Sequence, residues 1–174
     1  MFANPKLNVG QLELREGMWV ADFGAGTGAY TKEASVKVGP SGKVYAVEVQ
    51  KDMIKSLESD LKRAGITNVD CIWGDIETLH GTKIADAIMD AVIVSNVLFQ
   101  VSDKLGLVDE AKRILKKGGK VLLIDWSESF SGMGPSPIHV VKEEQAREFF
   151  TRRGFKILEN ISVGEHHYGI IFIA

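Results

Sequence analysis

Three glycines at alternate positions, Gly24, Gly26 and Gly28, follow a short apolar run and come just after Asp22. Glycine adopts positive φ without steric cost, so this spacing is typical of a sharp turn from a strand into a helix, where the backbone approaches a ligand closely. We expect the backbone N–H groups of this turn to point at the ligand. Several cofactors bind to glycine-rich turns, and the spacing alone does not name one of them.

Polar side chains stand at the ends of three further apolar runs. Glu48 closes a valine-rich run, Asp75 follows the next apolar run, and Asn96 follows a β-branched run over 90–95. Ligands of open α/β sheets bind beyond the carboxyl ends of the strands, so these side chains are expected to share one site with the glycine turn. A carboxylate at the end of the second strand is placed to accept hydrogen bonds from both hydroxyls of a ribose.

Two classes of cofactor fit the glycine turn. Residues 24–29 satisfy the loose dinucleotide fingerprint GxGxxA, so a nicotinamide-dependent oxidoreductase stays open as an alternative. A pyrophosphate would require the turn to cradle negative charge, whereas S-adenosylmethionine carries an ammonium and a sulfonium beside its carboxylate. Asp22 is an acid placed directly ahead of the turn, which suits cationic groups and disfavours a phosphate. The acid therefore favours S-adenosylmethionine.

The elements that must position these residues alternate along the chain. Apolar patterns predict strands at 18–23, 43–49, 68–73, 90–95, 121–125, 155–162 and 165–174. Helical spacing predicts a helix from the turn to residue 38 and another over 54–64. A third helix is predicted to begin at an N-cap, Ser102, and to end at Gly118–Gly119, and a last helix to end at Gly154. Residues 78–89 predict an irregular or helical crossover. Only Val163 and Gly164 separate the last two strands, so these strands should be antiparallel. Residues 1–16 show weak periodicity and predict a short helix followed by a loop.

These elements predict an α/β fold: one domain over residues 1–174 with a doubly wound seven-stranded sheet, mostly parallel, and an antiparallel C-terminal hairpin. Residues 126–139 form a connection longer than most loops in a compact domain, as lids and binding loops often do. The sequence leaves three alternatives: the site is open, this loop covers it, or a second subunit of a homo-oligomer covers it.

The composition excludes several classes of protein. The chain has 174 residues, of which 45% are hydrophobic and 25% charged, and these are ordinary values for a globular protein. Its 21 basic and 23 acidic residues are mixed along the chain, which leaves no broad footprint for a nucleic acid. Cys71 is the single cysteine, and there is neither a signal-peptide core nor a run long enough to span a bilayer. We therefore expect a cytoplasmic protein without a transmembrane segment.

Five segments, taken together, resemble the ordered motifs of class I S-adenosylmethionine-dependent methyltransferases. They are Ala21–Gly28, Tyr45–Glu48, Gly74–Ile76, Ser95–Leu98 and Leu115–Val121. The resemblance runs from about Leu14 to the C-terminus and is greatest to the branch that includes the ubiquinone, menaquinone and arsenite methyltransferases. It implies a Rossmann-like sheet whose seventh strand lies antiparallel to the fifth. It also implies S-adenosyl-L-methionine as the methyl donor and S-adenosyl-L-homocysteine as the product.

The same resemblance implies roles for the residues at the strand ends. The glycine turn contacts the methionine moiety, Glu48 the ribose diol, and Asp75 the adenine amino group, with Ile76 packed on the ring and the segment from Asn96 beside the sulfonium. The cofactor site predicted in this way comprises Asp22, Gly24, Gly26, Gly28, Glu48, Val49, Asp75, Ile76, Asn96 and Val97.

Two positions depart from this family. Phe99 and Gln100 stand where many relatives have one or two histidines, so a general base is not expected there. Arsenite methyltransferases need several cysteines, and this chain has only Cys71, which argues against arsenic methylation.

The methyl acceptor is the least determined part of the prediction. A sulfonium methyl is already activated, so the enzyme chiefly aligns the reactants and excludes water, and a base is needed only if the nucleophile starts protonated. The candidate acceptor contacts are Phe99, Asp125, Trp126 and His139. Each of them also has a structural interpretation, such as packing in the core or standing at the end of a strand. No metal is expected, because His166 and His167 should point to opposite faces of a strand. We expect a small-molecule acceptor; a non-catalytic cofactor-binding subunit remains the alternative.

Overall fold

The computed structural model describes residues 3–130, 132 and 134–174 of the chain. Its strands are β1 (Trp19–Phe23), β2 (Lys43–Glu48), β3 (Val69–Trp73), β4 (Met89–Ser95), β5 (Leu115–Trp126), β6 (Lys156–Ile161) and β7 (His167–Ile173). Its helices are α1 (Pro5–Gly10), α2 (Ala29–Val38), α3 (Lys51–Arg63), α4 (Lys104–Ile114), α5 (Glu143–Arg152) and the 3₁₀ helix η1 (Pro137–His139). Within the described residues, none of these helices combines the length and the apolar character that crossing a bilayer requires.

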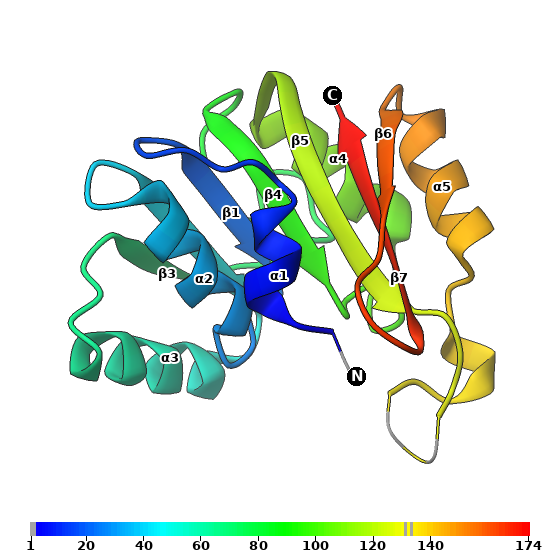
Figure 1. Ribbon diagram of the computed structural model, residues 1–174, viewed down its shortest axis with the longest axis horizontal. Coiled ribbons are helices and arrows are strands. Elements are labelled where there is room, and N and C mark those ends of the chain that lie inside the picture. The colour runs from blue at the N-terminus through cyan, green and yellow to red at the C-terminus, as the bar shows by residue number, and fades with distance from the viewer. Residues whose placement is uncertain (1–2, 131, 133) are drawn as a thin grey trace.

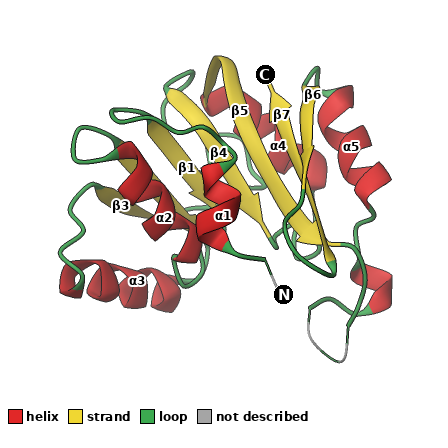
Figure 2. Cartoon of the chain, in the orientation of Figure 1, coloured by secondary structure: helices red, strands yellow, loops and turns green. Residues whose placement is uncertain are grey.

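All seven strands form one sheet in the order β3-β2-β1-β4-β5-β7-β6 (Figures 1 and 2). Neighbouring strands from β3 to β5 pair in parallel, whereas β7 is antiparallel to both β5 and β6. The predicted doubly wound sheet with an antiparallel C-terminal hairpin is therefore confirmed. Because β1 lies beside β2 on one side and β4 on the other, the winding direction reverses there, and ligands of such sheets bind at this point.

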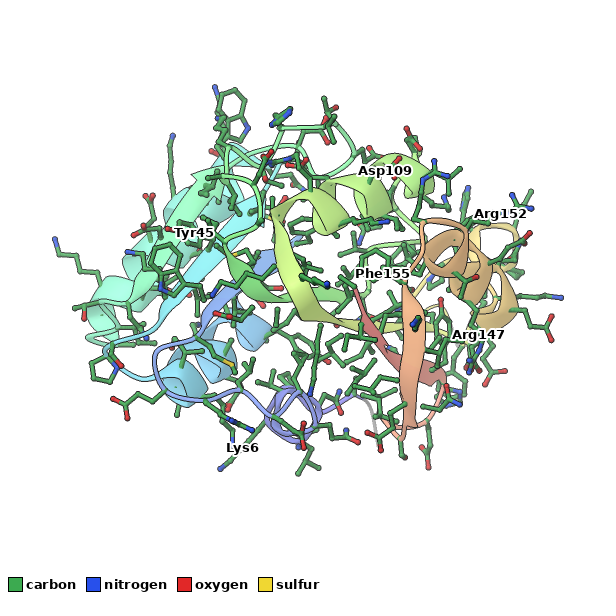
Figure 3. The ribbon with its side chains drawn as sticks, turned by 90° about the horizontal axis from the view of Figure 1, so that it is seen from above. Lys6, Tyr45, Asp109, Arg147, Arg152 and Phe155 are labelled. Carbon is green, nitrogen blue, oxygen red and sulfur yellow. The ribbon has the colours of Figure 1, made fainter. Side chains whose placement is uncertain are left out.

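The two faces of the sheet carry separate apolar layers. Helices α1, α2 and α3 cover one face, while α4 and α5 cover the other, so that Lys6 of α1 and Asp109 of α4 lie on opposite sides of the sheet when the molecule is seen from above (Figure 3). Residues 91–94 of β4 are buried on both faces. This explains why β4 is a continuous apolar run instead of an alternating one.

Two predicted boundaries of α4 are wrong. The N-cap is Asp103, whose carboxylate accepts a hydrogen bond from the Gly106 N–H at 2.8 Å, and not Ser102. The helix ends at Ile114, and β5 begins at once instead of after Gly118–Gly119. The reason is tertiary: the backbone of these two glycines pairs with that of Ala174, at the end of the chain, so the glycines belong to the sheet.

The chain passes from β3 to β4 without a helix, so the crossover over residues 78–89 is irregular and not helical. A buried carboxylate from α4 holds this crossover. Glu110 accepts hydrogen bonds from the N–H groups of His80 and Thr82, from the Thr82 hydroxyl, and from Arg113. Burial alone would raise the pKa of Glu110, but these hydrogen bonds outweigh it and lower the pKa to about 2. A charged network thus fixes the segment in place of a packed helix.

Candidate functional site

A cavity of about 220 Å³ lies at the carboxyl ends of the parallel strands, at the reversal point of the sheet. It is lined by Gly24, Gly26, Val47, Glu48, Val49, Gln50, Met53, Gly74, Asp75, Ile76, Glu77, Val97, Gln100 and Val101. Four segments that are distant in the sequence supply these residues: the glycine turn and the ends of β2, β3 and β4. Most of the predicted cofactor contacts are therefore brought together here, while Asp22, Gly28 and Asn96 lie outside the lining.

The glycine turn is shaped by close packing as well as by its backbone. Gly24, Gly26 and Gly28 all have positive φ, of 70°, 54° and 76°. A Cβ on Gly24 would lie 2.7 Å from Val97 Cγ2, and a Cβ on Gly28 would lie 2.3 Å from Leu57 Cδ1. Glycine at these two positions lets α3 and the segment after β4 approach the turn, which closes two walls of the site.

We expect Gly28→Ala to destabilise the fold by about 2–4 kcal/mol, because it adds a left-handed backbone cost to a clash with buried Leu57. Urea denaturation measures this loss. Gly65→Ala is the matched control, since Gly65 has a similar φ of 68° but open space around its would-be Cβ, so only about 1–2 kcal/mol should be lost. Equal losses in the two variants would show that packing against α3 does not matter.

The expectation that the amides of the turn point at a ligand is wrong for most of them. Four of them are already bonded within the chain: Gly24 and Ala25 to the Val47 carbonyl, Gly28 to the Ala25 carbonyl, and Gly26 to Glu48 Oε2. A pyrophosphate would find these four donors occupied and a carboxylate bonded to the turn. The arrangement therefore counts against the dinucleotide alternative.

Glu48 is the carboxylate at the centre of the cavity wall. It is buried, and its two oxygens accept hydrogen bonds from the N–H groups of Gly26 and Gln50 at 3.1 and 3.0 Å. A carboxylate oxygen can accept more than one hydrogen bond, so each retains capacity toward the cavity. The backbone thus holds two acceptors side by side, an arrangement that matches a pair of adjacent hydroxyls.

The far end of the cavity combines an acid with apolar walls. Asp75 accepts hydrogen bonds from the Glu77 N–H at 2.9 Å and from the Thr78 hydroxyl at 2.8 Å, so its carboxylate caps its own turn. Ile76 and Val101 line the cavity beside it. Apolar walls that end at a hydrogen-bond acceptor suit a planar heterocycle with an amino group.

Asp22 lies beneath the turn. It is only 2% exposed, and the Thr31 hydroxyl donates to its Oδ2 at 2.5 Å, which ties the first turn of α2 to β1. Burial raises the pKa of Asp22 to about 6; hydrogen bonds from Thr31 oppose this rise, and the charge of Glu48 adds to it.

Asn96 marks the fourth strand end. Its φ is 56°, a left-handed conformation that asparagine tolerates better than most residues, and its N–H donates to the Ile124 carbonyl at 2.8 Å. Its Oδ1 is buried, with no hydrogen-bond partner among the described residues. A buried acceptor of this kind is costly, and a ligand donor at the sheet edge would satisfy it.

Asp125, predicted as an acceptor contact, is placed as a clamp. It is fully buried, and its oxygens accept hydrogen bonds from the N–H groups of Leu98 and Trp126, both at 2.8 Å. Burial raises the pKa of Asp125 to about 6, against the effect of these backbone donors. The carboxylate therefore holds the segment after β4 against β5 and positions the Val97 wall of the cavity.

The other predicted acceptor contacts also lie outside the cavity lining. The Trp126 ring packs on His167, with ring centroids 4.2 Å apart. Phe99 is half-buried, and His139 is exposed in η1, where its Nδ1 lies 2.9 Å from the Ser136 hydroxyl. His166 precedes β7 with a φ of 64°, so the expected alternation of His166 and His167 along one strand is wrong.

Sequence reasoning missed several residues of the cavity wall, namely Val47, Gln50, Met53, Gly74, Glu77, Gln100 and Val101. What could have indicated these residues is their position next to a motif, more than their residue type. Gln50 and Met53 follow the carboxylate of Glu48 into α3, and Val101 follows the motif after β4. Apolar and amide side chains are common everywhere in a chain, so only adjacency to a motif could have indicated them.

Comparisons with known proteins agree with this geometry. The model of a family described as "Methyltransferase domain" matches residues 14–159. The chain is 33% identical over 116 residues to the ubiquinone/menaquinone biosynthesis C-methyltransferase UbiE of Pasteurella multocida, an alignment covering 66% of this chain and 42% of that protein. The chain thus spans less than half the length of this curated relative.

Solved structures share the complete fold. A SAM-dependent methyltransferase from Aquifex aeolicus superimposes with a TM-score of 0.90 and 26% identity, covering 99% of this chain and 90% of that one. A putative type 11 methyltransferase from Sulfolobus solfataricus has a TM-score of 0.75 at 23% identity, over 97% of this chain and 87% of the other, and shows the fold alone. The chain therefore belongs to the class I S-adenosylmethionine-dependent methyltransferase family.

Proposed function

We propose that this chain binds S-adenosylmethionine in the cavity and transfers its methyl group to a small-molecule acceptor. The observation that carries the proposal is the row of acids, with Glu48 and Asp75 on the cavity wall and Asp22 beneath the turn, around a turn whose amides are already bonded. Such a site favours a ligand with hydroxyls, an amine and positive charge over one with a pyrophosphate.

The residues present fit this cofactor part by part. Glu48 offers two fixed acceptors to the ribose hydroxyls. Asp75 and Ile76 hold the adenine. The carboxylate of Asp22 and the unsatisfied Oδ1 of Asn96 lie outside the cavity lining, and we assign the cationic end of the cofactor to their side of the site. The bound cofactor supplies an electrophilic methyl group on a sulfonium. The task of the protein is then to orient that methyl and to exclude water.

Binding of the cofactor should depend on pH through Asp22. Its pKa of about 6 means that the carboxyl is neutral at pH 5 and charged at pH 7. Because only the charged form of Asp22 attracts an ammonium, the affinity for S-adenosylhomocysteine should rise with pH over this range. The rise should be up to about tenfold for each unit by which the bound ligand lowers the pKa of Asp22. Ionisation of the buried group itself lowers stability as pH rises from about 4 to about 6, so the two effects have opposite signs.

Calorimetric titration at pH 5, 6 and 7 checks this dependence. Asp22→Asn should bind with an affinity that no longer varies with pH. Asp125 has a similarly raised pKa, so Asp125→Asn is the matched control and should retain the pH dependence of the unaltered protein. If Asp22→Asn still shows the full dependence, Asp22 does not face the cationic end of the cofactor.

Two experiments test the proposed function. S-adenosylhomocysteine at 100 times its Kd should stabilise the fold by about 2.7 kcal/mol, seen as a raised melting temperature, whereas NADH should not. Stabilisation by NADH alone would sink the assignment. Incubation with labelled methyl donor and a metabolite extract then tests transfer: a labelled small molecule supports the enzyme, and binding without transfer favours a non-catalytic subunit.

A further inference from the structure

Trp73 ends the edge strand β3, next to the carboxylate at the centre of the cavity wall. In the parallel pairing of β2 with β3, Trp73 is the partner of Glu48. The tryptophan is 49% exposed, so packing in the core does not account for an indole at this position. The described lining of the cavity does not include Trp73, so any effect of the indole on a ligand must pass through other residues.

One peptide group connects this indole to the Glu48 carboxylate. The Trp73 Nε1–H donates to the Val49 carbonyl at 2.9 Å. The N–H of the same peptide group belongs to Gln50, and it donates to Glu48 Oε1 at 3.0 Å. A peptide group is planar and trans, so its C=O and N–H point in opposite directions and can only turn together. The indole and the carboxylate therefore hold the two ends of one rigid unit.

This peptide group lies where β2 leaves the sheet. The strand ends at Glu48 and α3 begins at Lys51, so Val49 and Gln50 belong to neither element. At this end of the two strands the Gly74 N–H donates to the Glu48 carbonyl at 3.1 Å, which is one residue too early to orient the Val49 carbonyl. The side chain of Trp73 extends the connection between the strands to that next residue.

Two lysines hold the ring of Trp73. The Nζ of Lys51, at the start of α3, lies 3.9 Å from the ring centroid, and the Nζ of Lys83, on the β3–β4 crossover, lies 5.1 Å from it. Lys83 Nζ also donates to the Trp73 carbonyl at 2.6 Å. Each cation–π contact is weak at an exposed site, but the two together favour the ring orientation in which Nε1 reaches the Val49 carbonyl.

We propose that Trp73 is a positioning residue for the ribose subsite, acting through the Val49–Gln50 peptide group on the Glu48 carboxylate. This rests on the proposed binding of S-adenosylmethionine. Hydrogen bonds in a chain polarise one another, so the bond from the indole strengthens the bond from the Gln50 N–H to Glu48. Because Gln50 holds one carboxylate oxygen and Gly26 the other, both acceptors stay directed at a pair of adjacent hydroxyls.

Trp73→Phe tests this connection, because it keeps an aromatic ring beside Lys51 and removes the Nε1–H donor. Calorimetric titration compares S-adenosylhomocysteine with its 2′,3′-dideoxy analogue, which lacks both ribose hydroxyls. The unaltered protein should bind the analogue at least about 100-fold more weakly, since two hydrogen bonds to a charged acceptor are lost. In Trp73→Phe the affinity for S-adenosylhomocysteine should fall about 3–10-fold, and that for the analogue less than about twofold, so the ribose selectivity shrinks.

Trp19→Phe is the matched control. Trp19 is 37% exposed at the start of β1, at the opposite end of the parallel strands, where its ring centroid lies 6.0 Å from that of Tyr45. This variant should keep both affinities. A merely structural role of Trp73 would weaken both ligands by the same factor, and that result, or an unchanged selectivity in Trp73→Phe, would overturn the proposal. Failure of S-adenosylhomocysteine to bind the unaltered protein would instead overturn the proposed function itself.

Discussion

Glu48→Ala should raise the Kd for S-adenosylhomocysteine by at least about 100-fold, since two hydrogen bonds to a charged acceptor are lost and each contributes about 1.5–3 kcal/mol. The carboxylate also bonds the N–H groups of Gly26 and Gln50, so the fold itself should lose about 1–2 kcal/mol. Calorimetric titration measures the first effect and urea denaturation the second. The loss of binding should greatly exceed the loss of stability.

Two further variants sharpen this result. Glu58→Ala removes an exposed carboxylate from α3 and should leave both quantities unchanged. Glu48→Gln keeps the shape of the side chain but puts an NH₂ group against one of the two backbone donors, so it should bind nearly as weakly as the alanine variant. Unchanged affinity in Glu48→Ala would show that the two oxygens do not contact the ribose.

Glu110→Gln should lower the free energy of unfolding by about 3–5 kcal/mol at pH 7, because removing one partner of a buried ion pair leaves the other charge uncompensated. Glu110 is fully buried, and the Arg113 side chain bonded to it is only 9% exposed. Urea denaturation measures the loss, and Glu58→Gln is the exposed control. A loss below about 1 kcal/mol would mean that Arg113 finds sufficient compensation in Asp86.

The pH dependence of the same network has a defined sign. The pKa of Glu110 is about 2 in the folded chain and near 4.5 when unperturbed. A lowered folded pKa stabilises the protein above the unfolded value, and this contribution is lost as pH falls through the folded value. Unaltered protein should therefore lose stability between about pH 5 and pH 2 more steeply than Glu110→Gln does.

The crossover also links stability to the site. Residues 74–77 supply one wall of the cavity, and the Asp75 N–H donates to the Gly81 carbonyl, next to the segment that Glu110 holds. Loosening that segment should weaken cofactor binding although Glu110 touches no ligand.

Much of the fold followed from local patterns. The β-branched run of β4 predicted a strand buried on both faces, and the short spacer at Val163 and Gly164 predicted an antiparallel final hairpin, because period and loop length are properties of neighbouring residues. The same holds for the cofactor class. Parallel strands bring their carboxyl ends to one edge, so acids at successive strand ends point to one site.

The tertiary structure alone decided where hydrogen bonds go between residues far apart in the chain. Glu48 reaches back 22 positions to occupy the Gly26 amide, so the glycine turn presents a carboxylate instead of free donors. Glu110 replaces a helix at the crossover from 28 positions away. Asp125 became a buried clamp on the backbone of Leu98 and Trp126. Sequence patterns report the conformation of neighbouring residues, whereas the partner of a buried polar group is set by which distant segments pack against it.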